Sequence, residues 1–332
     1  MRFISIQRIR SLVITVAAVL LAGTVGHAQD AAAPKRPKIT GISHVGYFVS
    51  DLPKAIEFWH DFLGYEVYST LPKKDSTDTR IAFVKINDRQ HVELFNEALT
   101  APPNMMSHIC FTVDNVEQMR AYLRSKGIDV KTSDGSKTKE GDYAFEIKDP
   151  DGMLVEFIQS LPTGVEAQAA GKFESATRIS DKIYHVGFLV GNSQKSIDFY
   201  GKILGFTETW RGGANPAELS WINMKVPDGY DYVEFMLYHS LPDPKGWGTK
   251  NHLSLSVPDI AKAVDELKAR PAYAAYAASA KQPVVINTGV NQKRQVNLYD
   301  PDGTRVELME PFTVTGKPTP PSSAPPPPPS HD

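Results

Sequence analysis

The sequence predicts an α+β chain built from four copies of one βαβββ module. Four strand-like segments, SHVGYFV, SHICFTV, YHVGFLV and NHLSLSV, begin at residues 43, 107, 184 and 251, and each has a histidine in second place. Each is followed by Val-Glu-Leu or Val-Glu-Phe, and the glutamate comes 48 to 55 positions after the histidine. The two halves of the chain repeat at 141 residues. Motifs that return in a fixed order indicate internal repeats of one supersecondary unit.

Within each unit the pattern changes from strand to helix and back to strands. Residues 51–64 and 192–205 predict helices, since apolar residues in the first of them recur at helical spacing (Ala55, Ile56, Phe58, Trp59 and Phe62). Gly64 and Gly205 suit the helix ends. Three strands are expected next. In units two and four the last two strands are joined by Asp-Pro-Asp-Gly at 149–152 and 300–303, a strong turn signal.

The repeats divide the mature chain into two predicted domains, residues 40–160 and 181–312, with a polar linker at 161–180. Short links within each half favour pairing of neighbouring modules, although pairing of unit one with four and of two with three is the alternative. Residues 29–39 predict a flexible lead. Residues 313–332 are rich in proline, and we expect them to be extended and disordered.

The first 28 residues have the layout of a secretory signal. Three arginines precede an apolar run at residues 12–22, and small residues stand at 26 and 28. The run is shorter than the roughly 20 residues of a membrane-spanning helix, so we expect a periplasmic or secreted protein without stable membrane insertion, an uncleaved anchor being the alternative. The formal charge of −2 argues against a nucleic-acid partner. Cys110 is the only cysteine, which excludes an intrachain disulfide.

The repeated histidines and glutamates are candidate metal ligands. Side chains alternate along a strand, so the aliphatic face of each Val-Glu-Phe segment packs on the helix while the glutamate shares the opposite face with the histidine. Two imidazoles and two carboxylates per module pair suit a first-row divalent ion. We therefore predict two ions per chain, held by His44, Glu93, His108 and Glu156 in the first half and by His185, Glu234, His252 and Glu307 in the second.

A small residue follows each of these histidines by two positions: Gly46, Cys110, Gly187 and Ser254. Two interpretations stay open. The small side chains either leave space beside the metal for a ligand or relieve crowding where the sheet curls.

These motifs resemble those of the vicinal oxygen chelate superfamily, which includes glyoxalase I, extradiol dioxygenases, methylmalonyl-CoA epimerases and bleomycin or fosfomycin resistance proteins. The resemblance covers residues 38–312 and implies that paired modules curl into half-open barrels around a metal. The His-Glu-His-Glu order is similar to that of bacterial-type glyoxalase I. It implies a Ni, Co, Zn, Fe or Mn cofactor and a lyase or isomerase acting on a small substrate with vicinal oxygens through an enediolate-like anion, with Glu156 or Glu307 as the base. Phe48 and Leu189 stand where that family often has arginine, which argues against glutathione recognition.

Two other functions remain open. An extradiol dioxygenase would use His185, His252 and Glu307, and a non-catalytic binding or resistance protein would need no complete ligand set. The chain is expected to be a monomer or a dimer.

The residues two positions before the glutamates differ between the halves: His91 and Leu154 in the first, Tyr232 and Arg305 in the second. Arg305 predicts binding of a substrate carboxylate, Tyr232 a hydroxyl donor to an oxyanion, and His91 acid–base work. The sequence thus favours the second half as the catalytic one. The alternative is that Arg305 and Tyr232 lie at the barrel rim in solvent.

Overall fold

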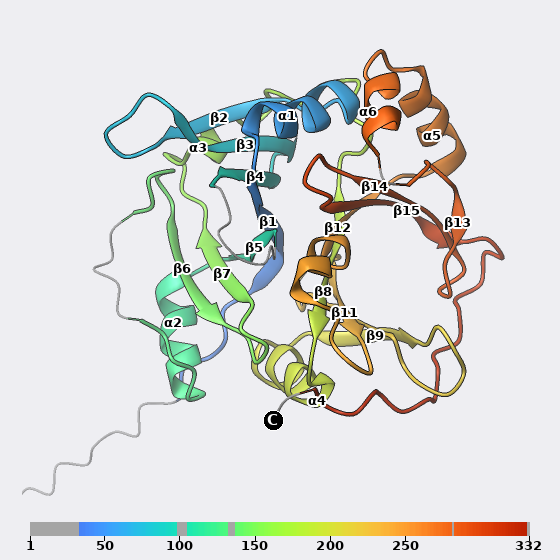
Figure 1. Cartoon of the computed structure of the whole chain (residues 1–332). Helices are drawn as coiled ribbons and strands as arrows, with labels where there is room; N and C mark the ends of the chain where they lie inside the picture. Colours follow the sequence, from blue (N-terminus) through green and yellow to red (C-terminus); the bar gives the residue numbers. More distant parts are fainter. Residues whose placement is uncertain (1–32, 98–104, 132–136, 281, 331–332) are drawn as a thin grey trace, which may run out of the picture. The chain divides into compact units, whose positions relative to one another are not determined.

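Two curled β-sheets, each built from two consecutive modules, make up most of the chain in the computed structural model (Figure 1). The structure describes residues 33–97, 105–131, 137–280 and 282–330. The predicted signal at residues 1–28 lies outside this part. Among the described helices, none combines the length and the apolar character that crossing a membrane requires.

The first sheet joins modules one and two, in the strand order β2-β3-β4-β1-β5-β7-β6. Strand β1 pairs with β4 in parallel and with β5 in antiparallel orientation, so the two modules meet along their first strands. The strands are β1 (Ile39–Val49), β2 (Val67–Pro72), β3 (Thr79–Asn87), β4 (Gln90–Asn96), β5 (Met106–Val113), β6 (Tyr143–Lys148) and β7 (Leu154–Gln159). We expected three strands after the second helix. The described residues form two, and residues 132–136 of that stretch lie outside the description.

The second sheet joins modules three and four in the order β13-β14-β15-β12-β8-β11-β10-β9. Strand β8 repeats the place of β1, since it pairs in parallel with β11 and in antiparallel orientation with β12. The strands are β8 (Ile183–Val190), β9 (Thr207–Gly212), β10 (Trp221–Lys225), β11 (Tyr232–Leu237), β12 (His252–Ser256), β13 (Asn287–Thr288), β14 (Lys293–Tyr299) and β15 (Arg305–Thr313). The predicted α+β class and the pairing of neighbouring modules are confirmed.

The helices begin and end largely where the sequence predicts. Asp51 caps the first helix by accepting a hydrogen bond from the Lys54 amide, and Gly64 ends it at a φ of 85°, a conformation that glycine adopts without strain. The last turns of the first and third module helices are π-helical. The helices are α1 (Leu52–Glu57) with η1 (Phe58–Phe62), α2 (Val116–Ser125), α3 (Val165–Gln168), α4 (Ser193–Ser196) with η2 (Ile197–Ile203), η3 (Pro244–Thr249), α5 (Ile260–Ala269) and α6 (Tyr273–Ser279).

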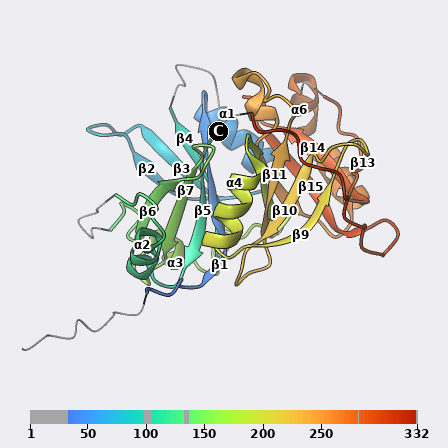
Figure 2. The same cartoon turned by 90° about the horizontal axis from the view of Figure 1, so that it is seen from below.

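The two halves share packing as well as a chain connection (Figure 2). Helix α6 of the fourth module contacts η1 of the first, where the rings of Phe62 and Tyr276 stack with centroids 4.0 Å apart. Gln90 of β4 accepts a hydrogen bond of 2.9 Å from the Ile183 amide at the start of β8. Since these contacts join apolar surface and buried polar groups, the two sheets are held against each other.

Both ends of the described chain are more ordered than expected. In the predicted flexible lead, Arg36 forms an ion pair of 3.0 Å with Asp228. The predicted disordered tail, residues 313–332, instead runs along the second half as far as it is described. Thr319 donates to the Asn291 carbonyl at 2.6 Å, and the amides of Ser322 and Ser330 donate to Arg211 and Gly191. An extended proline-rich segment makes no internal hydrogen bonds, so its polar groups remain available for such partners.

Candidate metal centres

The four predicted ligands of the first half converge on the inner face of their sheet. His44 and His108 come from the neighbouring strands β1 and β5, and their Nε2 atoms lie 3.0 Å apart. The Glu156 carboxylate lies 3.0 Å from Nε2 of His44 and 3.5 Å from that of His108. Glu93 lies 3.7 and 3.6 Å from the same two atoms. All four side chains are largely withdrawn from solvent.

The second half repeats this arrangement. Nε2 of His185 and Nε2 of His252 are again 3.0 Å apart. Glu307 lies 3.4 Å from His185, and Glu234 lies 3.7 Å from His252. The strand registers agree as well, since Gly46 faces Glu93 and Gly187 faces Glu234 in the parallel pairs. Duplication of the sequence motif has therefore kept the donors at equivalent strand positions, but in the second half Glu307 approaches only His185 and Glu234 only His252, so the compact donor group there is His185, Glu234 and His252.

The donor atoms fit a divalent cation. Nitrogen and oxygen ligands about 2.1 Å from one ion lie roughly 3.0 to 3.4 Å from each other, close to the separations in both halves. Nδ1 of His252 donates to the Lys250 carbonyl at 2.9 Å, which leaves the lone pair of Nε2 facing the other ligands. Oε2 of Glu307 is buried without a hydrogen-bond partner among the described residues, as a carboxylate awaiting a cation would be.

The small residues two positions after the first histidines make room for the second histidines. A Cβ atom on Gly46 would lie 2.5 Å from Cε1 of His108, and one on Gly187 would lie 2.5 Å from Nδ1 of His252. These distances are too short for nonbonded carbon and nitrogen. Glycine is therefore required because an imidazole of the ligand set fills the space, which favours the crowding interpretation at these two positions.

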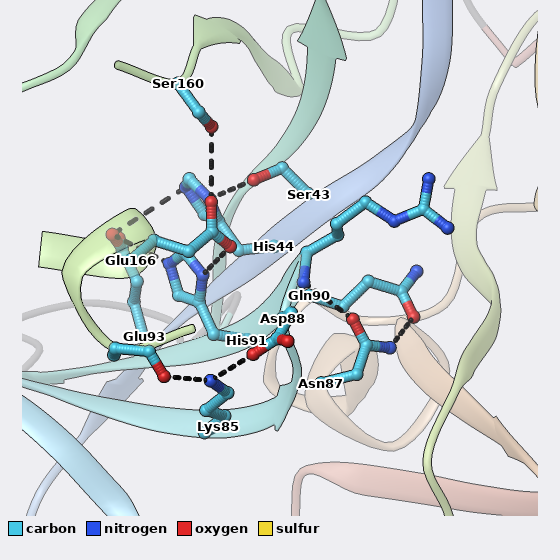
Figure 3. A network of polar contacts seen from close by, with 12 residues as sticks. Ser43, His44, Lys85, Asn87, Asp88, Gln90, His91, Glu93, Ser160 and Glu166 are labelled. Carbon is cyan, nitrogen blue, oxygen red and sulfur yellow. Dashed lines mark hydrogen bonds and ion pairs between the residues drawn. The ribbon is translucent and has the colours of Figure 1, made fainter. Parts of the chain in front are cut away.

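Glu166 is a polar neighbour of the first centre that the sequence did not reveal, and it contacts the centre through His91. The ring of His91 stacks on His44, with centroids 4.5 Å apart, and its Nδ1 lies 3.3 Å from Glu166 (Figure 3). Glu166 belongs to α3, inside the predicted linker, and accepts a hydrogen bond from Ser160. Burial lowers the pKa of His91, but hydrogen bonds to Glu166 and Glu93 outweigh it and raise that pKa to about 9.

Tyr232 holds the corresponding place in the second centre. Its ring stacks on His185 with centroids 4.6 Å apart, while its hydroxyl points to the sulfur of Met309 at 4.0 Å. The side chain is buried, so the alternative of a solvent-exposed rim position is wrong for Tyr232.

Arg305 also lies inside, beside the second histidine of the second centre. Its guanidinium contacts Nδ1 of His252 and donates to the Lys250 carbonyl at 3.1 Å. The His252 imidazole and the Arg305 guanidinium thus both donate to the carbonyl oxygen of Lys250. Arg305 also lines the cavity beside Glu234 and Glu307, where its remaining donors are available to a bound molecule.

The cavities beside the two centres differ in charge. The first, of about 300 Å³, is lined by seven carboxylates and one arginine, the latter paired with Glu97 at 2.8 Å. The carboxylates are Glu93, Glu97, Glu140, Asp142, Glu146, Glu156 and Glu166. The second, of about 320 Å³, is lined by two carboxylates, Glu234 and Glu307, and by two cations, Lys250 and Arg305.

The pKa values of the buried ligand carboxylates also differ between the centres, but they follow burial and the adjacent histidines and not the net charge of the cavity. Burial raises the pKa of Glu93, but the charges of His44, His108 and His91 and a hydrogen bond from His91 lower it to about 2. Burial, with the charge of Glu307, raises the pKa of Glu234 to about 8. The protein thus holds the first set of carboxylates in the charged form more firmly than the second.

Comparison with known proteins agrees with this geometry. Residues 41–157 and 182–308 match the Glyoxalase/Bleomycin resistance protein/Dioxygenase superfamily. A lactoylglutathione lyase from Schizosaccharomyces pombe is 35% identical over 106 residues, 31% of each chain. Glyoxalase I from Saccharomyces cerevisiae is 24% identical over 234 residues, which cover 64% of this chain and 66% of that protein. The alignments thus span from about a third to two thirds of these relatives.

Solved structures share the fold over most of the chain. The Mn(II)-bound glyoxalase from Novosphingobium aromaticivorans superimposes with a TM-score of 0.61 at 19% identity, covering 82% of this chain and 83% of the other. Homoprotocatechuate 2,3-dioxygenase from Brevibacterium fuscum, in complex with 3,4-dihydroxyphenylacetate, gives 0.60 at 19% identity, covering 89% and 87%.

Proposed function

We propose that this chain, which belongs to the Glyoxalase/Bleomycin resistance protein/Dioxygenase superfamily, is a divalent-metal-dependent lyase or isomerase of the glyoxalase type. The observation that carries the proposal is the paired ligand set. In each half two imidazole Nε2 atoms lie 3.0 Å apart with two glutamates beside them. Relatives described as lactoylglutathione lyases, and the fold of a Mn(II)-bound glyoxalase, support the same reaction class. The ions that suit these donors are Ni, Co, Zn, Fe or Mn.

The second centre is the one we assign to catalysis. A divalent ion bound there would polarise the vicinal oxygens of a small substrate and stabilise an enediolate-like anion. Glu307 is the proposed base, because burial raises the pKa of this carboxyl and a ligand carboxylate that leaves the metal can take a proton. Arg305 lines the same cavity and is placed to hold a substrate carboxylate. The Tyr232 hydroxyl faces Met309, so we assign its ring to positioning His185.

The test combines metal analysis with turnover. The mature chain should bind close to two divalent ions, and Glu307→Gln should lower anaerobic isomerase activity on a panel of hydroxycarbonyl compounds by about 10²- to 10⁴-fold. Glu156→Gln is the matched control at the equivalent position of the first centre, and it retains activity if the second centre alone is catalytic. Full activity of the Glu307 variant with metal retained would show that the base is misassigned, and absence of metal under every loading condition would refute the proposal.

An extradiol dioxygenase is the second candidate. His185, His252 and Glu307 supply the two imidazoles and one carboxylate that a non-haem iron centre uses, and Glu307 lies 3.4 Å from His185. Oxygen uptake by the iron-loaded protein with catechols, compared with anaerobic isomerase activity, separates the two reactions.

We further propose that the protein is exported, on the basis of the signal-like residues 1–28. Amino-terminal sequencing of the protein from a host that secretes it should begin at Gln29. A mature chain that still begins at Met1 would contradict export by cleavage.

A further inference from the structure

The second half contains another cavity, of about 450 Å³, that includes none of the eight proposed metal ligands. Its charged lining consists of Lys225, Lys293 and Lys317, and no carboxylate lines it among the described residues. We call this cavity the basic pocket. It borders Tyr232, whose ring stacks on His185, and therefore lies one aromatic ring away from the second centre.

The lysines of the basic pocket lack acidic partners. No carboxylate of the described chain lies within ion-pair distance of any of the three ammonium groups. Lys293 donates to the Tyr184 hydroxyl at 2.7 Å, and Lys225 donates to the Gly229 carbonyl at 3.1 Å. Each ammonium has three donors, so each retains further donors. Lys225 and Lys293 are half-buried with no carboxylate at ion-pair distance, which favours binding of an anion, and the charge of Lys293 also acts on Glu234 and Glu307.

The remaining walls offer flat apolar surface and two unpaired polar groups. Tyr184 and Trp210 both line the basic pocket. Oδ1 of Asn223, a side chain only 7% exposed, has no hydrogen-bond partner among the described residues. Nε1 of Trp210 is buried and equally unpaired. A bound molecule with a hydroxyl group would satisfy Asn223, since an amide oxygen accepts.

The chain after β15 completes the pocket. Residues 316–319 line it, and Thr319 fixes this segment by donating to the Asn291 carbonyl. The segment adds the exposed Lys317 to the lining that Lys225 and Lys293 form. In the first half the chain after β7 forms α3 and delivers Glu166 to His91 instead. The segment that follows the last strand thus contributes a cation, Lys317, in the second half and an anion, Glu166, in the first.

We propose that the basic pocket binds a small hydroxylated aromatic carboxylate. The carboxylate would lie among the three lysines, the ring against Trp210 and Tyr184, and the hydroxyl at Asn223. The basic pocket contains none of the proposed metal ligands, but it shares Trp210 and Asn291 with the proposed catalytic cavity and lies directly beside it.

The experiment is calorimetric titration of the full mature chain with p-hydroxybenzoate, before and after removal of metal with a chelator. We expect one site per chain in both states, weaker binding as salt is raised, and no comparable binding of the uncharged p-hydroxybenzamide. Lys293→Gln and Lys225→Gln should each weaken binding about tenfold. Lys262→Gln, an exposed lysine paired with Glu266 on α5, is the control and should bind like the unsubstituted chain.

Equal binding of the amide and the acid, no binding of p-hydroxybenzoate, or unchanged affinity in both lysine variants would each overturn the proposal. The amide and salt comparisons use the unsubstituted chain, so they decide even if a variant fails to fold. Binding that survives in a chain without isomerase activity would leave the basic pocket in place while refuting the proposed reaction.

Discussion

The two half-barrels of this protein share a set of metal ligands but differ in the residues next to them. In both halves the Nε2 atoms of the two histidines lie 3.0 Å apart, and a glycine makes space for the second imidazole. His91 stacks on the first histidine in one half, and Tyr232 stacks on it in the other. Opposite the second histidine, Leu154 in one half corresponds to Arg305 in the other.

The residues proposed to bind the metal are thus the same in both halves, whereas the neighbouring residues that could contact a substrate differ. The ligand positions follow from strand register, which duplication preserves, whereas the neighbouring positions carry no such constraint. The first cavity is strongly acidic, and the second combines two carboxylates with Arg305 and Lys250. Two carboxylates balance the charge of a divalent ion, so the second cavity remains positive and favours an anionic substrate.

Removal of a histidine pair should have the largest effect. We expect the double variant His185→Ala, His252→Ala to lose one of two metals and at least about a thousandfold in activity, because its centre has lost both imidazoles. The double variant His44→Ala, His108→Ala should also lose one metal but remain active. Elemental analysis and steady-state kinetics on both proteins provide the measurement. Activity that survives in the first variant, or disappears equally in both, would contradict the assignment of catalysis to the second half.

Substitution of Gly46 or Gly187 should have a smaller effect on its centre than removal of a histidine pair. Gly46→Ala should displace His108 and Gly187→Ala should displace His252, each lowering metal affinity at its own centre by about 10- to 100-fold. Titration with a competing chelator measures this. Gly201→Ala is the control, since its Cβ would come no closer than 3.5 Å to a neighbouring atom. If Gly46→Ala and Gly187→Ala bind metal as the control does, the glycines do not set the imidazole positions.

The residues opposite the second histidines should affect substrate affinity. Arg305→Ala should raise KM for an anionic substrate by about 10- to 100-fold, because a charge-assisted contact is lost, whereas Leu154→Ala should leave KM unchanged. Metal content separates the two roles available to Arg305, which also contacts His252. A variant that loses metal and kcat together, with KM unaltered, would show that Arg305 positions the histidine and does not bind substrate.

The repeat made the fold and the eight ligand positions predictable, since a histidine and a glutamate returned at fixed places on alternating strands. Glu166 was not predictable, because it lies in a polar linker outside the repeated motifs and reaches His91 only after α3 folds back. The ordered tail was missed for a related reason. Proline content predicts an extended chain but does not show that Arg211 in the edge strand β9 and Asn291 in the turn between β13 and β14 offer backbone partners.

The last expected effect concerns stability: it is the pH dependence that the His91–Glu166 pair adds at the first centre. In the metal-free protein the pKa of His91 is about 9, above the roughly 6.5 of an unfolded chain, so folding favours the protonated imidazole. The resulting stabilisation is fully present below the unfolded value and is lost as pH rises through about 9, a decrease of roughly 3 kcal/mol in the free energy of unfolding. Tyr232 does not titrate in the folded protein in this range, because burial raises its pKa well above the ordinary 10.

Urea unfolding of chelator-treated protein between pH 7 and 10 measures this loss, and Glu166→Gln isolates it from other groups that titrate there. Without the Glu166 carboxylate the pKa of His91 falls, so the variant should be less stable than the parent at pH 7 and nearly equal to it at pH 10. Glu174→Gln is the matched control, since Glu174 lies in the same linker and pairs with Arg178 at 3.1 Å, away from His91. If the difference between Glu166→Gln and the parent protein is the same at both ends of the range, His91 does not carry the proton, and the distinction between the two centres rests on Arg305 and the charged cavity walls.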